Sequence, residues 1–78
     1  MNAGQFQAYG IHTGTVQNTR LYELDTPVVD TREDAVRLGM AALEAHSFAN
    51  RLHIVEGIVD PYNGVVYPEI VDEIDVPR

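Results

Sequence analysis

The 78-residue chain contains no cysteine and no lysine. Without cysteine it can form neither disulfide bonds nor thiolate metal sites, and it offers no thiol nucleophile. Without lysine it lacks the side chain that a P-loop places on the β- and γ-phosphates. The segment 10–15, which superficially resembles such a loop, is therefore not a nucleotide-binding motif.

Long apolar runs are also missing, and neither a signal-like N-terminus nor an Asn-x-Ser/Thr sequon is present. We expect a soluble cytoplasmic protein that does not contact membranes. The length predicts a single domain over residues 1–78, in which residues 1–4 and 72–78 are candidates for fraying. A chain of this size buries only about 60% of the surface that it exposes when unfolded. Support from a partner or a second copy is therefore expected.

Positive charge is scarce. The chain has five arginines and no lysine against twelve Asp and Glu residues, which gives a net charge of −7. Such a surface repels phosphate backbones, which argues against direct nucleic-acid binding and favours a protein partner with a basic surface. The carboxylates gather in two clusters that could imitate a series of phosphates: Asp30, Glu33 and Asp34, and then Glu69, Asp72, Glu73 and Asp75.

Residues 30–47 carry the one long helical signal. Two overlapping capping pairs, Asp30 with Glu33 and Thr31 with Asp34, mark its start. At about 100° per residue, apolar side chains cover more of this helix than one contact with a sheet requires. The stripe predicted to face the sheet is Val36, Met40 and Leu43. The remaining arc, predicted as a self-association surface, is Leu38, Ala41 and Ala45.

Gly39 lies in the middle of this predicted helix. A glycine there costs about 0.5–1 kcal/mol relative to alanine. A common compensation is the close approach of another backbone.

Alternating apolar residues predict four strands around the helix, over residues 5–12, 20–29, 52–59 and 65–71, with turns at 13–19 and 60–64. Pro68 has no amide donor, which favours an edge position for the last strand. Segment 52–59 is apolar on both faces, which predicts a central strand that is covered on two sides. We therefore predict an α+β domain of order β-β-α-β-β, with one amphipathic helix packed on a four-stranded antiparallel sheet. A single helix covers only one face, so an oligomer or a docked partner is expected on the other.

The three histidines and the single serine form no catalytic or metal-binding pattern. Ser47 and His46 are neighbours in a helix and point about 100° apart, unlike a nucleophile and its base. The spacing of His12, His46 and His53 matches no zinc or calcium motif. We predict no catalytic residue, no cofactor and no metal ligand.

Protein binding is the remaining class of function. Tyrosine supplies a large contact area with a polar tip and is enriched at interface hot spots. We predict a non-enzymatic protein-binding module whose contact residues are Glu33, Asp34, Tyr62, Tyr67, Asp72, Glu73 and Asp75.

In charge and expected architecture, though in no residue motif, the chain resembles small acidic proteins encoded by phages, such as anti-CRISPR and anti-restriction inhibitors. The resemblance implies an inhibitor that blocks a basic site on a nucleic-acid-handling complex. Two alternatives stay open: a structural protein that forms a homodimer or larger oligomer, and a small-molecule-binding or catalytic domain that uses its histidines.

Overall fold

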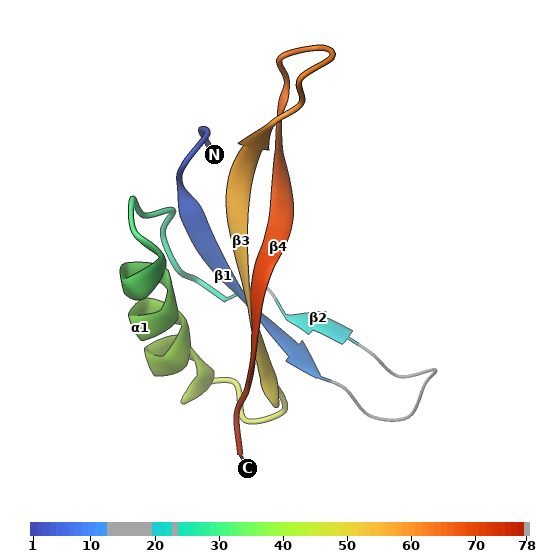
Figure 1. The fold of residues 1–78 in the computed structure, drawn as a ribbon. Helices are drawn as coiled ribbons and strands as arrows, with labels where there is room; N and C mark the ends of the chain where they lie inside the picture. Colours follow the sequence, from blue (N-terminus) through green and yellow to red (C-terminus); the bar gives the residue numbers. More distant parts are fainter. Residues whose placement is uncertain (13–19, 23, 78) are drawn as a thin grey trace.

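A computed structural model describes residues 1–12, 20–22 and 24–77, with the backbone alone described at 20–22. One helix lies on one side of an antiparallel sheet (Figure 1). In chain order the elements are β1 (Phe6–His12), β2 (Arg20–Tyr22), α1 (Arg32–Leu43), β3 (Arg51–Val59) and β4 (Val66–Asp75). The strand order is β2-β1-β3-β4, so β3 is central and β4 forms an edge, as Pro68 predicts.

The prediction of a four-stranded β-β-α-β-β fold is wrong, because only three full strands form the sheet on which the helix packs. These strands are β1, β3 and β4, which make a β-α-β-β arrangement. The predicted strand at residues 20–29 contributes only the three residues of β2, which pair with the end of β1. The turn predicted at residues 13–19 lies outside the described residues.

The chain leaves the sheet after β2 because Leu24 turns into the core, where it is 2% exposed. The amide of Thr26 donates to the carbonyl of Leu24 at 2.7 Å, which bends the backbone here. Pro27 has no amide proton with which to continue a ladder. Only Val29 returns to the sheet, in an isolated bridge with Phe6. Burial of one large apolar side chain therefore replaces the strand pairing that the alternation predicts.

The helix starts at the second of the two predicted caps. The hydroxyl of Thr31 accepts a hydrogen bond from the amide of Asp34 at 3.2 Å. The helix ends at Leu43, earlier than predicted. The amides of Ala45 and His46 each donate to the carbonyl three residues back, which is the tighter 3₁₀ pattern of a helix end.

Replacing Thr31 with alanine should lower the free energy of unfolding by about 1 kcal/mol, because the amide of Asp34 then loses its acceptor. Thr31→Ser keeps the hydroxyl and should be nearly neutral. Urea unfolding followed by circular dichroism measures both changes. Equal losses in the two variants would show that the methyl group of Thr31, and not its hydroxyl, stabilises the helix.

The helix presents Ala35, Gly39 and Leu43 to the core, and Met40 is 40% exposed. The predicted stripe is thus wrong at Met40, because the helix is rotated so that its smallest residues face the sheet. Small residues let the two backbones approach more closely than a stripe of large side chains would.

The sheet approaches Gly39 closely, through side chains and not through a backbone. A Cβ atom added at this position would lie 2.7 Å from the Cβ of Ala8 and 2.8 Å from Cδ1 of Leu52. Both distances are too short for any real side chain. The glycine therefore sets how closely α1 packs on β1 and β3.

The core is thin. Among the described residues the buried cluster holds seven side chains, and three of them are alanines. The seven are Ala8, Leu24, Ala35, Leu43, Ala49, Leu52 and Ile54. No polar or charged residue is buried among those that the structure describes. This core lies between the single helix and one face of the sheet.

A tight turn joins β3 to β4 where the sequence predicts it, and the hairpin projects beyond the rest of the sheet (Figure 1). The amide of Asp60 donates to the carbonyl of Val65 at 2.9 Å, and Gly64 has a φ of 70°, which glycine adopts without strain. The carboxylate of Asp60 accepts from the amide of Tyr62, and the side chain of Asn63 accepts from the amide of Val65. Strand β4 runs on to Asp75, beyond the predicted end at residue 71, and residues 72–75, which the sequence marks as candidates for fraying, pair with β3.

Candidate functional site

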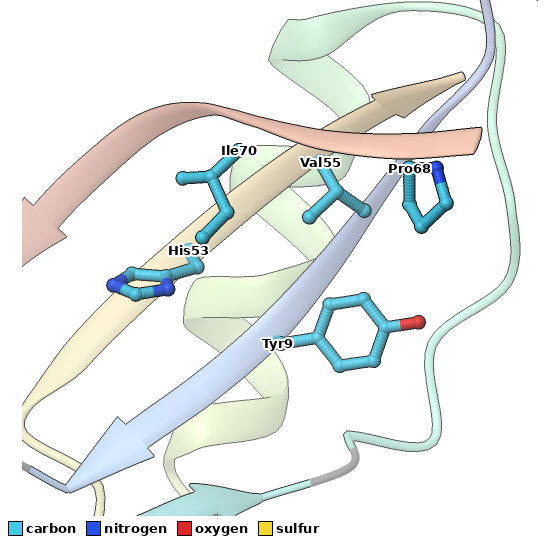
Figure 2. A pocket seen from close by; sticks show the side chains of 5 residues that line it. All are labelled: Tyr9, His53, Val55, Pro68 and Ile70. Carbon is cyan, nitrogen blue, oxygen red and sulfur yellow. The ribbon is translucent and has the colours of Figure 1, made fainter. Parts of the chain in front are cut away.

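The sheet face that points away from α1 has no helix over it among the described residues. Side chains alternate between the two faces of a strand. Leu52 and Ile54 of β3 belong to the core beneath the helix, so His53 and Val55 point to the other side. Figure 2 shows these two side chains with Tyr9 in front of the sheet and the helix behind it. Strand β3 is thus central, as predicted, but only one of its faces is covered by the helix.

A pocket of about 330 Å³ opens on this uncovered face. Strand register assembles it, since Tyr9 of β1 pairs with His53 and Ile70 of β4 pairs with Val55. We call it the face pocket, and its lining is Tyr9, His53, Val55, Pro68 and Ile70 (Figure 2). The lining is mostly apolar, which suits an aliphatic or aromatic group of a ligand.

His53 places a polar atom beside this apolar pocket. Its side chain is 14% exposed, and its Nε2 atom lies 3.1 Å from a carboxylate oxygen of Glu73. The two atoms are not aligned for a hydrogen bond, and this buried nitrogen has no hydrogen-bond partner among the described residues. An unsatisfied buried polar atom costs about 1–3 kcal/mol. A ligand that brings a hydrogen-bonding group to this position would remove that cost.

A second hollow, of about 510 Å³, lies along the outer side of β4. The register between β3 and β4 shifts here, since Ile54 pairs with Asp72 and Val55 pairs with Ile70. Val71 is therefore the extra residue of a β-bulge, which locally twists and opens the strand. We call this the edge hollow, and it is lined by Ile70, Val71, Asp72 and Glu73.

Three arginines form surface ion pairs with the acidic residues. Arg32 pairs with Asp72 and so joins the start of α1 to β4. Arg51 pairs with Asp75 at 2.9 Å. Arg37 pairs with Asp34 at 3.4 Å within the helix. Exposed pairs of this kind contribute only about 0–1 kcal/mol each, so a partner could replace them readily.

The residues predicted to contact a partner do not form one site. Tyr67, Asp72, Glu73 and Asp75 lie on β4, where the last three occupy its C-terminal end. Tyr62 is 97% exposed at the tip of the β3–β4 hairpin. Tyr67 and Glu73 are separated by roughly 20 Å of extended strand. Glu33 and Asp34 belong to the first turn of α1, in the other layer of the fold.

Of the predicted self-association residues, Leu38 and Ala41 lie on the outer side of the helix, and Ala45 lies beyond its end. Leu38 is half-buried, whereas Ala41 and Ala45 are exposed, and none of the three belongs to the buried core cluster. This arrangement agrees with an arc that does not face the sheet. The arc consists mostly of small residues and offers little area for a partner to bury.

Reasoning from sequence did not identify the face pocket. The available signal was the second apolar face of residues 52–59, which contains His53 and Val55. The strand register that brings Tyr9 and Ile70 beside them depends on pairing between distant segments, which alternation alone does not specify.

Within residues 1–12, 20–22 and 24–77, no group of three His, Asp or Glu side chains could hold a metal ion. The described helix is too short and too polar to cross a membrane. Comparisons with protein-family models, with curated proteins and with solved structures give no significant match, so no activity transfers to this chain from a relative.

Proposed function

We propose that this chain is a non-enzymatic protein-binding module that binds its partner through the uncovered face of the sheet. The face pocket is the observation that carries this proposal, because it is apolar, preformed and open on a domain with a thin core. An anchoring side chain from the partner would fill it. Filled pockets of this kind are where interface binding energy concentrates.

Exposed apolar residues lie on this face at the pocket and again near the end of the β3–β4 ladder, while on β3 the N-terminal residues Met1 and Asn2 lie over Gly57 between them. Ile70 is 52% exposed and Val59 is 46% exposed, and Val66 pairs with Val59 at the end of the β3–β4 ladder. Burial of apolar area contributes roughly 25 cal/mol per Å². A partner that covers this face would therefore add a second hydrophobic layer to the sheet.

Charge indicates the class of partner. The chain carries a net charge of −7, and the edge strand β4 holds four of its acidic residues: Glu69, Asp72, Glu73 and Asp75. Of these, Glu73 and Asp75 lie on the uncovered face, because they pair with His53 and Arg51 of β3. A basic protein surface complements this strand and would be steered towards it. We propose as the partner a nucleic-acid-handling complex whose basic site the module blocks, in the cytoplasm of the host if a phage encodes the chain.

The experiment is affinity capture from an extract of the organism in which the chain acts, followed by affinity measurement with the purified captured protein. Ile70→Asp puts a charge at the mouth of the face pocket and should weaken binding by about a hundredfold, as expected for a hot spot. Met40→Asp is the matched control, since Met40 is exposed to a similar degree on the helix and should leave affinity unchanged.

Salt dependence tests the electrostatic part of the proposal. Affinity for the captured protein should fall steeply as ionic strength rises, because exposed charges are screened. If Ile70→Asp and Met40→Asp bind equally well, the uncovered face is not the interface. If the wild type is a dimer in light scattering that Ile70→Asp converts to a monomer, a second copy occupies the face and the proposed partner is wrong.

A further inference from the structure

We infer that the partner contributes an extended basic segment, which pairs as an additional strand with the free edge of β4 between Ile70 and Asp75. This inference rests on the proposed function and names the element that the module recognises. Strand addition of this type takes its affinity from main-chain hydrogen bonds and its specificity from side-chain pockets.

Two hydrogen bonds show to which side the N–H and C=O groups of β4 point. One is made by Gly57 of β3 and the other by Val76, which follows β4. The amide of Gly57 donates to the carbonyl of Gln5 at 2.9 Å, towards β1. Gly57 pairs with Pro68 on its other side. Hydrogen-bonded and non-hydrogen-bonded pairs alternate along an antiparallel ladder, so the backbone of Pro68 faces the free edge. Proline has no amide proton, and strand pairing at the edge cannot continue through this residue.

The second hydrogen bond defines the other end of β4. The amide of Val76 donates to the carbonyl of Asn50 at 2.9 Å, towards β3. By the same alternation, Glu73 and Asp75 direct their backbone groups to the free edge. Ile70 does so as well, because its partner Val55 has the same orientation in β3 as Gly57. The segment from Ile70 to Asp75 therefore offers unpaired donors and acceptors.

The negative charge of β4 favours a basic segment, and not a second copy of this chain, as the added strand. An antiparallel pair of β4 edges would set the acidic residues of this segment against one another, and like charges in facing positions destabilise a pair of strands. The edge hollow lies beside the same backbone groups, and Asp72 and Glu73 contribute to its lining. A lysine or arginine side chain on the added strand would reach these carboxylates while its backbone pairs with β4.

The test uses a short peptide in which lysine and valine alternate, titrated into the isotopically labelled full chain and followed by NMR. We expect saturable binding and slower hydrogen exchange at the amides of Ile70, Glu73 and Asp75. A peptide with glutamate in place of lysine should not bind. A lysine–valine peptide that is N-methylated at alternate residues along its pairing edge keeps its charge and should bind about tenfold more weakly or worse.

Glu73→Pro removes an outward-facing amide without removing a hydrogen bond to β3, but it also removes the carboxylate, so it is compared with Glu73→Gln, which lacks the charge and keeps the amide. Relative to Glu73→Gln it should weaken peptide binding about tenfold. Val66→Pro is the matched control, because Val66 also faces the free edge but lies before Pro68, outside the pairing segment. Equal binding of the methylated and unmethylated peptides would overturn strand addition, even if Glu73→Pro fails to fold. The proposed function would survive that result, since it depends on the response of the captured protein to Ile70→Asp.

Discussion

Replacing Leu52 with alanine should destabilise the domain by about 2–5 kcal/mol, as expected for removal of a fully buried leucine side chain. Leu52 has no exposed surface and packs at the closest approach of β3 to the helix. Domains of this kind have free energies of unfolding of about 5–15 kcal/mol, so the loss is a large fraction of the total. Because the core is thin, few side chains around Leu52 can move into the cavity that the substitution leaves.

Urea or thermal unfolding followed by circular dichroism measures this loss. Val59→Ala is the matched control, because Val59 ends the same strand and is 46% exposed. Its effect should stay within about 0.5 kcal/mol. A change below about 1 kcal/mol for Leu52→Ala would mean that the helix does not pack on β3 as the structure describes.

Replacing Gly39 with valine should destabilise the domain by about 3 kcal/mol, the upper end of the usual cost of overpacking. The first added carbon would already lie 2.7 Å from Ala8 and 2.8 Å from Leu52, so the helix must move away from the sheet. Helix propensity works weakly in the opposite direction, because valine is a poorer helix former than alanine but a better one than glycine. The steric effect is the larger one, and the sign of the change therefore distinguishes close packing from propensity.

Ala41→Val is the control for the Gly39 prediction, since Ala41 is exposed on the same helix and should lose only a few tenths of a kcal/mol. A double-mutant cycle sharpens the test. In a Leu52→Ala background the clash with Leu52 is removed and the clash with Ala8 remains, so the cost of the added side chain at position 39 should fall in part. Additive effects of the two changes would contradict the contact between Gly39 and Leu52.

Both substitutions also bear on the candidate site. Leu52 lies next to His53 in β3, and the same strand carries Val55 on the opposite face. A helix that moves away from β3 uncovers the other face of the strand that carries His53 and Val55. Binding by these variants should therefore be measured at a temperature where circular dichroism shows that they remain folded.

Local features of the fold could be predicted from the sequence because short-range chemistry specifies them. The hydroxyl of Thr31 marks the start of the helix, and Gly64 and its neighbours specify the β3–β4 turn. Pro68 predicts an edge strand because it cannot donate to a ladder. Gly39 predicts a close approach, since its cost in a helix needs compensation.

Other features depended on contacts between segments that are distant in the sequence. The alternation over residues 20–29 predicts a strand, but Leu24 gains more by entering the core than by continuing the ladder. Helical periodicity predicts that Met40 faces the sheet, but the small residue at position 39 allows a closer packing in which Met40 is exposed. In both cases tertiary packing outweighed a local preference.

By itself, the sequence determined that this is an acidic, cysteine-free α+β chain with one capped helix, a central apolar strand and a proline-marked edge. Only the tertiary structure decided that Tyr9, Val55 and Ile70 meet in one pocket, and that the free edge of β4 is open beyond Pro68. The physical reason is that composition, caps and turns act over a few residues. Strand register and helix rotation instead depend on how side chains from distant segments fill a shared core.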